Sequence, residues 1–313
     1  MINYLFKYKV LILIFITANF SCVEYKPSFN ENHLTVLGTA QDAGYPHIGC
    51  NKDCCVKNIS DDMEYFVTSI GLTDINNDKY YLFEATPDIS SQIRYLKDGT
   101  ENQKIVDGIF LTHAHIGHYS GLMYLGREAL GAKNVPIYAM PRMKNFLQEN
   151  GPWSQLVSLG NIDIKEINHN QNISLTKELT VIPFTVPHRD EFSETVGYKI
   201  LGKNRSALFI PDIDKWYLWE KSIIEEVKSV DYAFLDATFF SGEEINRSMS
   251  EIPHPFISET IEIFEDEELL TKNKIYFIHF NHTNPVLNQK ISLRDSIIKL
   301  GFNFAKFGDR YEL

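Results

Sequence analysis

The chain has 313 residues, of which 44% are hydrophobic and 13% aromatic, so it has enough apolar side chains to build a substantial folded core. Its formal net charge at pH 7 is -11, spread along the sequence without a long acidic block, whereas a protein that binds a phosphate backbone presents a clustered basic face. Composition and charge therefore exclude a wholly disordered chain and argue against a nucleic-acid partner.

The N-terminus is typical of a bacterial export signal, because Lys7 and Lys9 precede an apolar run over 10–18. That run is about half of the ~20 residues that a membrane-spanning helix needs. Its end, NFSC, resembles a relaxed lipobox. We therefore interpret residues 1–22 as a signal peptide that leaves Cys22 as the lipidated first residue of an exported protein, periplasmic or anchored in the cell envelope. Ordinary cleavage nearby and an uncleaved N-terminal anchor are the alternatives.

From residue 34 onward, two kinds of segment alternate. Short apolar runs rich in β-branched and aromatic residues predict strands, at 34–39, 65–74, 80–85, 106–112, 135–140, 179–186, 195–201, 207–212, 231–237 and 275–280. Helical periodicity is present over 89–97, 120–130, 141–149, 214–229, 257–270 and 288–300. We predict a polar linker over 23–33 and one α/β (α+β) domain over 34–313, with two packed sheets and helices outside them.

Three cysteines follow the first predicted strand within six residues, namely Cys50, Cys54 and Cys55. An exported protein is able to form disulfides, but one bridge here leaves a spare thiol, and adjacent cysteines rarely bridge to each other without strain. A metal ion would use all three sulfurs. A metal site and a disulfide with a buried thiol are therefore the two interpretations.

The segment LTHAHIGHYSGL over 111–122 places three histidines directly after a predicted strand. His113 and His115 are two residues apart in extended backbone, so their side chains point to the same side. His118 falls in the opening turn of the helix predicted next. The three imidazoles are thus able to converge on a metal ion.

Other candidate ligands lie at the ends of other predicted strands. His188 follows strand 179–186, Asp212 ends strand 207–212, and the late strand leads into His279 and His282. Any one of them alone is an ordinary turn or cap residue. Together they indicate a metal centre at which several strand ends meet.

These residues resemble the metal-binding pattern of the metallo-β-lactamase superfamily: THAHIGH, then a later His, an Asp and a final His. The resemblance covers nearly all of the predicted domain and implies a four-layer αββα sandwich with the metal at the strand ends. It also implies two zinc sites. The implied ligands are His113, His115 and His188 for the first zinc, and His118 and His279 for the second, with Asp212 bridging the two.

One position departs from the family pattern, which has an acidic residue where this chain has Gly117. In the family that carboxylate ligates the second metal and orients the attacking water, and glycine has no side chain to do either. The second site is therefore expected to be weak, empty, or completed by a water or by another side chain.

The cysteine segment LGTAQDAGYPHIGCNKDCC over 37–55 resembles two related branches, that of pyrroloquinoline quinone synthesis protein B (PqqB) and that of the phosphonate-pathway cyclic phosphodiesterases. EATPDISSQI, LDATF, IPHPFIS and HFNHTNPVL also match the PqqB branch. Those branches hold a structural zinc on a cysteine loop. The resemblance implies a closed zinc site of Cys50, Cys54, Cys55 and His282, although the familiar spacing is Cys-x-Cys-x-x-Cys.

The chemistry implied is hydrolysis, because a zinc-bound water has a pKa near 7 and supplies hydroxide at neutral pH. Asp212 would hold the centre, and His254 in EIPHPF is our candidate for proton transfer, with a surface-loop histidine as the equal alternative. Asp42, Tyr45 and Asp236 are placed to line the pocket, but an Asp at a strand end is as often a cap.

Our main prediction is a metal-dependent hydrolase of a phosphodiester, small ester or lactone, with one or two Zn²⁺ ions in the active site and one structural Zn²⁺. The alternative is a PqqB-like role in making or handling pyrroloquinoline quinone, as an oxygenase using Fe²⁺ or as a carrier. The export signal opposes it, because that biosynthesis starts from a cytoplasmic peptide. A binding module with a relict site is the third interpretation. We expect a small-molecule substrate and membrane contact only through Cys22.

Overall fold

The structure is a computed structural model that describes residues 31–56, 65–244, 253–287 and 292–313. The predicted signal peptide, Cys22 and residues 23–30 of the predicted linker lie outside the described residues. Among the helices that are described, none has the length and apolar character required to cross a membrane.

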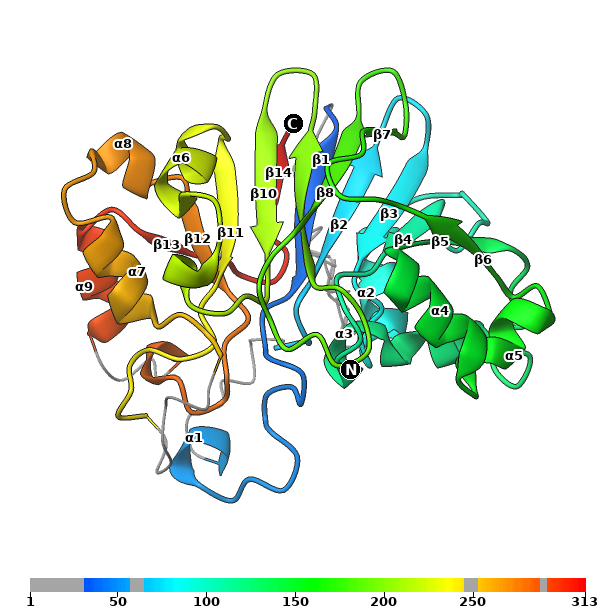
Figure 1. The fold of residues 1–313 in the computed structure, drawn as a ribbon, viewed down its shortest axis with the longest axis horizontal. Coiled ribbons are helices and arrows are strands. Elements are labelled where there is room, and N and C mark those ends of the chain that lie inside the picture. Colours follow the sequence, from blue (N-terminus) through cyan, green and yellow to red (C-terminus); the bar gives the residue numbers. More distant parts are fainter. Residues whose placement is uncertain (1–30, 57–64, 245–252, 288–291) are drawn as a thin grey trace, which may run out of the picture.

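Two seven-stranded sheets form the centre of the described part of the chain (Figure 1). The first has the order β14-β1-β2-β3-β4-β5-β6 and the second the order β13-β12-β11-β10-β9-β8-β7. The strands of the first are β1 (His33–Gly38), β2 (Ser69–Asp74), β3 (Lys79–Phe83), β4 (Gly108–Phe110), β5 (Val135–Ala139), β6 (Ile162–Glu166) and β14 (Arg310–Glu312). Those of the second are β7 (Ile173–Ser174), β8 (Thr180–Thr185), β9 (Val196–Leu201), β10 (Ser206–Ile210), β11 (Tyr232–Asp236), β12 (Ile275–Ile278) and β13 (Asn303–Phe304).

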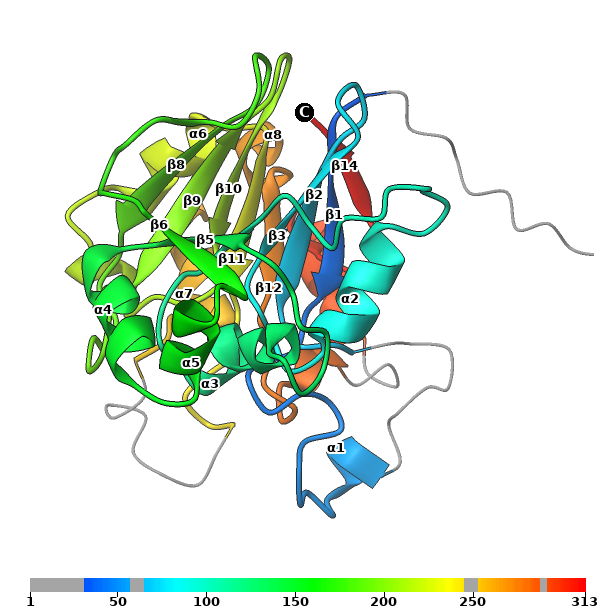
Figure 2. The ribbon, with the colours of Figure 1, turned by 90° about the vertical axis from the view of Figure 1, so that its right-hand side faces the viewer.

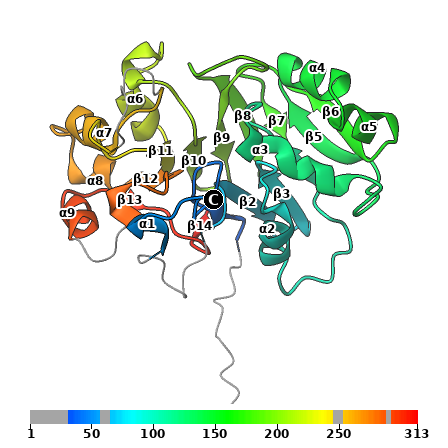
Figure 3. The same ribbon diagram turned by 90° about the horizontal axis from the view of Figure 1, so that it is seen from below.

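Helices cover the outer face of each sheet. In Figures 1 and 3 the helices α2 to α5 lie beside the first sheet and α6 to α9 beside the second, while Figure 2 shows the two sheets facing each other. These helices are α2 (Ile89–Leu96), α3 (Ile116–Tyr119), α4 (Pro141–Glu149), α5 (Trp153–Ser158), α6 (Ile223–Lys228), α7 (Ile257–Ile263), α8 (Leu269–Lys272) and α9 (Leu293–Lys299). The short α1 (Asp53–Val56) lies apart, on the loop after β1.

Alternation along the strands explains the layers, because successive strand residues point to opposite faces. Leu82 of β3 packs under the helices, whereas its neighbour Phe83 lies in the core between the sheets. In the second sheet Phe209 of β10 faces that central core and Leu208 faces the outer helices. Three apolar cores therefore separate four layers, and the predicted four-layer αββα sandwich is confirmed.

Three of the predicted helices were wrong in extent. Over 120–130 the structure has the 3-10 helix η1 (Ser120–Leu125) instead of the predicted α-helix. A Cβ on residue 121 would lie 2.0 Å from the carbonyl oxygen of Thr86, so the position requires glycine, and glycine disfavours an α-helix by about 0.8–1.0 kcal/mol. Over 214–229 only α6 is α-helical, following the 3-10 helix η2 (Trp216–Leu218). The prediction over 257–270 divides into α7 and α8.

Two tryptophans hold the segment before α6 in its non-helical path. The indole N–H of Trp216 donates to Oγ1 of Thr260 at 2.9 Å, and that of Trp219 donates to the carbonyl oxygen of Thr185 at 3.2 Å. Such long-range contacts outweigh local helix propensity. The short or polar strands β6, β7, β13 and β14 were missed by the sequence analysis.

Candidate metal centre

The first cluster consists of His113, His115 and His188, whose candidate ligand atoms all lie within 4.8 Å of one another. His113 and His115 follow β4, and Nε2 of His113 lies 2.8 Å from Nδ1 of His115. The ring of His188, after β8, has its centroid 5.3 Å from that of His113 and 5.0 Å from that of His115. The structure thus brings together the three residues predicted for the first metal.

The second cluster consists of Asp42, His118, Asp212 and His279, again within 4.8 Å. One carboxylate oxygen of Asp212, Oδ2, lies 2.8 Å from Nε2 of His118 and 3.3 Å from Nε2 of His279. The same residue reaches the first cluster, since its Oδ2 lies 3.8 Å from Nε2 of His113. Asp212 therefore lies between the two groups of histidines, where the sequence analysis placed it.

The ring nitrogens that face away from the cluster lie beside neighbouring oxygens. Three of them make hydrogen bonds, whereas His118 Nδ1 and Glu84 Oε1 form an ion pair without a hydrogen bond. The pairs are His113 Nδ1 with Thr112 Oγ1 at 2.8 Å, His118 Nδ1 with Glu84 Oε1 at 3.4 Å, His188 Nδ1 with Asp214 Oδ1 at 3.1 Å, and His279 Nδ1 with Thr238 Oγ1 at 2.8 Å. Metal-binding histidines are held in this way, since a partner on one nitrogen fixes the ring and leaves the other for the metal. Four Nε2 atoms are thereby directed inward.

The inner atoms fit a metal ion. In the described part of the chain, Nε2 of His188 and Nε2 of His279 are buried and make no hydrogen bond. A buried polar atom left without a partner costs about 1–3 kcal/mol, and a bound cation removes that cost. Imidazole nitrogens with carboxylate oxygens are also the donor set of catalytic zinc sites.

Electrostatics favour the ligand forms of His113 and Asp212. In His118 burial opposes protonation, but the Glu84 and Asp42 carboxylates outweigh it and raise the pKa well above its ordinary value. Burial, with the neighbouring charge of His118, holds the pKa of His113 well below its ordinary value. Burial alone would raise the pKa of Asp212, but His279 and His118 outweigh it and hold that pKa well below its usual range. At neutral pH the cluster therefore offers a neutral imidazole and an ionised bridging carboxylate, the forms that bind metals.

Two residues of the centre have backbone conformations that are uncommon for side chains larger than glycine. Glu84 has φ of 79° and His279 has φ of 68°, both in the left-handed region. Glu84 follows β3 and His279 follows β12. Strain of this kind persists where the surrounding structure fixes it, often at functional sites. Glu84, fully buried beside His118, was missed in the sequence analysis.

His254 lies in the centre rather than on a surface loop, so the alternative interpretation of this residue was wrong. Only 6% of it is exposed, its Nδ1 lies 2.8 Å from Oδ2 of Asp236, and it lies 3.4 Å from Oδ1 of Asp212. Burial opposes its protonation, but the Asp236 carboxylate outweighs burial and raises the pKa of His254. The other oxygen of Asp236 accepts from the backbone N–H of Thr238 at 2.9 Å, so Asp236 also caps this turn.

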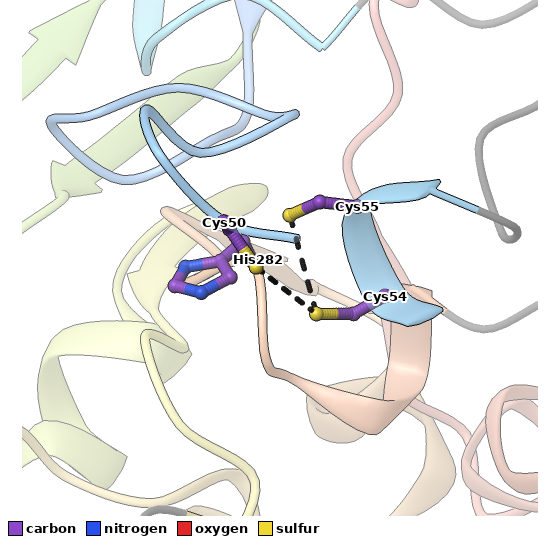
Figure 4. A group of neighbouring side chains, drawn as sticks. All are labelled: Cys50, Cys54, Cys55 and His282. Atoms are coloured by element: carbon purple, nitrogen blue, oxygen red, sulfur yellow. Dashed lines mark hydrogen bonds between the residues drawn. The ribbon is translucent and has the colours of Figure 1, made fainter. Parts of the chain in front are cut away.

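The cysteines form a separate cluster with His282 (Figure 4), and the four candidate ligand atoms lie within 4.8 Å of one another. The Sγ atom of Cys54 lies 3.8 Å from that of Cys50 and 4.0 Å from that of Cys55. A disulfide needs about 2.05 Å, and the three thiols are free. The four residues predicted for a structural zinc are thus brought together.

His282 is prepared to act as a neutral ligand. Its Nδ1 contacts Oδ1 of Asn281 at 3.0 Å, which leaves Nε2 for an ion. Burial and the neighbouring ring of His47, 4.1 Å away between centroids, lower the pKa of His282 to about 4. Tyr45 belongs to this region as well, because its hydroxyl donates to the carbonyl oxygen of Cys54 at 2.5 Å. Tyr45 therefore supports the cysteine loop.

The sequence is similar to a known family model and to curated proteins. The sequence model of the Beta-lactamase superfamily domain matches residues 79–280. Coenzyme PQQ synthesis protein B of Rhizobium meliloti is 22% identical over 88% of this chain and 96% of that protein. Its counterpart in Cupriavidus necator is 24% identical over 88% of this chain and 97% of that protein.

Two solved structures have folds similar to this one. Zn(2+)-bound PqqB from Methylobacterium extorquens superimposes with a TM-score of 0.74 and 20% identity, covering 90% of this chain and 100% of that one. A diphosphatase of the PhnP family superimposes with a TM-score of 0.63 and 24% identity, covering 90% of this chain and 97% of that one. Identities this low show a shared fold, and a fold alone hosts many activities.

Proposed function

The chain belongs to the β-lactamase superfamily, as its histidine motif predicted, and we propose that it is a metal-dependent hydrolase acting on a small-molecule phosphodiester, ester or lactone. One observation carries the proposal: buried histidines from separate strand ends converge on the single carboxylate of Asp212. A divalent metal bound there lowers the pKa of a coordinated water from about 15.7 to about 7 and polarises the oxygen of the attacked group.

The residues of the chain supply positioning and proton transfer. Thr112, Asp214 and Thr238 fix the rings of the ligating histidines. Asp236 holds His254 through Nδ1, so Nε2 of His254 is the ring atom that remains to exchange a proton. We therefore assign proton transfer to the leaving group to Nε2 of His254.

We further propose that Cys50, Cys54, Cys55 and His282 hold a structural zinc. Three sulfurs and one imidazole complete a tetrahedral set, which leaves no position for water, and closed sets of this kind are structural. Such an ion would tie α1 and its loop to the segment that follows β12.

A second candidate function has support of its own. The curated relatives described above are named coenzyme PQQ synthesis protein B, and zinc-bound PqqB superimposes with a higher TM-score than the diphosphatase, 0.74 against 0.63. The names of these relatives favour a PqqB-like role in coenzyme PQQ synthesis. The form of that role that we propose is an iron-dependent oxygenase or a carrier of pyrroloquinoline quinone. The site geometry is compatible with either metal, because imidazole and carboxylate ligate both zinc and iron.

Metal analysis with turnover assays separates the candidates. The purified protein is analysed for zinc and iron and assayed against p-nitrophenyl phosphodiesters, esters and a lactone panel. Zinc with hydrolytic turnover that is lost in His113→Ala supports the hydrolase. Iron with oxygen consumption and no hydrolysis overturns it in favour of the PqqB-like role. A purified protein with no metal at the His/Asp clusters and no turnover overturns both and leaves a binding module.

We also propose that the protein is exported and anchored through Cys22, with no membrane contact beyond the lipid and no nucleic-acid partner. The motif NFSC at the end of the apolar run supports this proposal. Globomycin treatment of cells that express the full chain is expected to block processing at Cys22. Normal processing in its presence would contradict lipidation.

A further inference from the structure

The family motif leaves one position unexplained, because Gly117 stands where the superfamily has an acidic metal ligand. Gly117 lies in α3, between His115 and His118, and it is buried. A glycine there provides no oxygen for the second metal. Either the second cluster lacks a carboxylate on this side, or another segment supplies one.

The structure shows what occupies the space beside Gly117. A Cβ built on Gly117 would lie 2.5 Å from Cα, 2.7 Å from Cβ and 2.7 Å from Oδ1 of Asp42. Cβ atoms essentially never approach other heavy atoms within 3.0 Å. Any side chain at position 117 is therefore incompatible with the present place of Asp42, and the carboxylate of Asp42 lies in the region into which that side chain would project.

Asp42 directs its carboxylate at the second cluster. Its Oδ1 lies 3.0 Å from Nε2 of His118 and 3.5 Å from Nε2 of His279, and it belongs to the group of four candidate ligand atoms that includes Asp212. The two carboxylates differ in burial, since 21% of the Asp42 side chain is exposed against 3% of the Asp212 side chain. Asp42 thus lies on the more open side of the cluster.

The backbone fixes Asp42 in this place. The N–H of Gln41 donates to the carbonyl oxygen of Phe280 at 2.9 Å, and the N–H of Phe280 donates to that of Thr39 at 2.8 Å. Ala40 forms an isolated parallel bridge with Phe280. Asp42 and His279 therefore come from two segments that pair with each other directly next to the cluster.

We propose that Asp42 is the carboxylate ligand of the second metal, supplied by the loop after β1 in place of residue 117, and that the glycine at 117 is what lets it approach. This inference rests on the proposed metal-dependent function. The sequence left the second site as weak, empty, or completed by a water or another side chain, and this proposal selects completion by another side chain. The site is then formed by Asp42, His118, Asp212 and His279. The second metal thus keeps a carboxylate ligand, which comes from position 42 instead of position 117.

Metal stoichiometry tests the proposal without an activity assay. Wild type, Asp42→Asn, Gly117→Ala and Asp163→Asn are stripped of metal, reloaded with Zn²⁺ alone, and compared by elemental analysis and by competition with a chromophoric chelator. Asn keeps the shape of Asp but removes the charge. Asp163 is a matched Asp→Asn control, because it lies in β6 and pairs with Lys165 instead of the cluster.

We expect wild type and Asp163→Asn to bind the same number of ions, two of them at the His/Asp clusters. Asp42→Asn should lose one of the two, or bind it at least about 10–100-fold more weakly, since even outer-shell changes have effects of that size. Gly117→Ala should do the same although it alters no ligand, because its methyl group displaces Asp42. Gly151→Ala is its control, since a Cβ at Gly151 meets nothing within 4 Å.

Unchanged stoichiometry and affinity in Asp42→Asn would overturn the proposal, and so would a wild type that binds fewer than two ions at the clusters. Circular dichroism and thermal melting identify a variant that fails to fold; if Asp42→Asn does so, Gly117→Ala decides. The outcome is independent of turnover: a wild type with two ions and no hydrolysis contradicts the proposed hydrolase and leaves the role of Asp42 intact.

Discussion

The two clusters differ in what holds their ligands, although one short segment serves both. His279 leaves β12 into the buried cluster, and His282, three residues later, joins the cysteines. In the buried cluster His113, His188 and His279 follow strand ends, and each of their rings has a hydrogen-bond partner on the outer nitrogen. In the cysteine cluster Cys50 and Cys54 are partly exposed and lie on a loop that carries only the four-residue α1.

The buried cluster is therefore a site that the fold positions, whereas the cysteine cluster is a site whose ion would help to fold its loop. Two sheets and three apolar cores position the buried histidines. A helix of four residues is not stable by itself, so the cysteine loop depends on what its sulfurs bind. Removing metal should therefore affect chemistry at the buried cluster and stability at the cysteine cluster.

The largest expected effect comes from Asp212, which both groups of histidines share. Asp212→Asn removes the bridging charge, so hydrolytic turnover should fall by more than about 100-fold, since changes to the outer partners alone reach about 10–100-fold. Metal content and kcat are measured on the same preparation, with Asp163→Asn as the matched control. Full metal content with near-normal kcat would contradict the bridging role.

The cysteine cluster should respond in the opposite way. Cys54→Ser is expected to lose one zinc ion and to lower the Tm by roughly 5–10 °C, the result of losing a few kcal/mol in a domain of this size. Asp42 lies on the same loop, but the bond from the N–H of Gln41 to the carbonyl oxygen of Phe280 holds it without the cysteines. The kcat of the protein that remains folded should therefore change less than about threefold. A collapse of kcat with an unchanged Tm would reverse the proposed division of roles.

A smaller effect sharpens the description of the buried cluster. Glu84 is fully buried, and its Oε1 lies 3.4 Å from Nδ1 of His118. Glu84→Gln keeps the shape and removes the charge that supports this ring, so affinity for the second metal should fall about tenfold while the first ion is retained. Chelator competition measures both. Equal weakening of the two ions would show that Glu84 acts on the whole centre instead of on His118.

Sequence could predict the residues whose position follows from strands. His113, His188 and His279 each come after an apolar run, and the ends of neighbouring strands meet at the edge of a sheet. The motif and the spacing therefore placed six of the buried candidates together. The domain layout followed from the same periodicity, with helices between strands.

The parts that could not be predicted depend on contacts between distant segments. Asp42 reaches the cluster because its loop pairs with Phe280, more than two hundred residues away in the chain, and no local pattern reports such a pairing. Position 121 requires glycine because it lies against the backbone of Thr86, and glycine weakens the predicted helix. His254 was named as a candidate, but the sequence left its burial open, since its neighbours Pro253 and Pro255 are typical of exposed loops.

The smallest expected effect concerns the segment that the two clusters share, which Glu244 holds in place. Oγ1 of Thr283 donates to Oε1 of Glu244 at 2.6 Å, and Asn281 donates to Oγ1 of Thr283 at 2.7 Å while its own Oδ1 lies 3.0 Å from Nδ1 of His282. A chain of polar contacts therefore runs from Glu244 to the histidine of the cysteine cluster. Burial raises the pKa of Glu244 to about 7.

Because the pKa of Glu244 is higher in the folded state than the ~4.3 of an unfolded glutamate, the folded protein binds a proton more tightly, and stability falls as pH rises through about 7. Glu244→Gln resembles the protonated form at every pH, so it should remove that part of the decline, of order 1 kcal/mol because the side chain keeps some access to water. Thermal melts of zinc-loaded wild type and variant at pH 6 and pH 8 measure it, with the surface change Glu243→Gln as the control. If wild type and Glu244→Gln lose the same stability between the two pH values, the decline arises elsewhere and Glu244 does not couple pH to the shared segment.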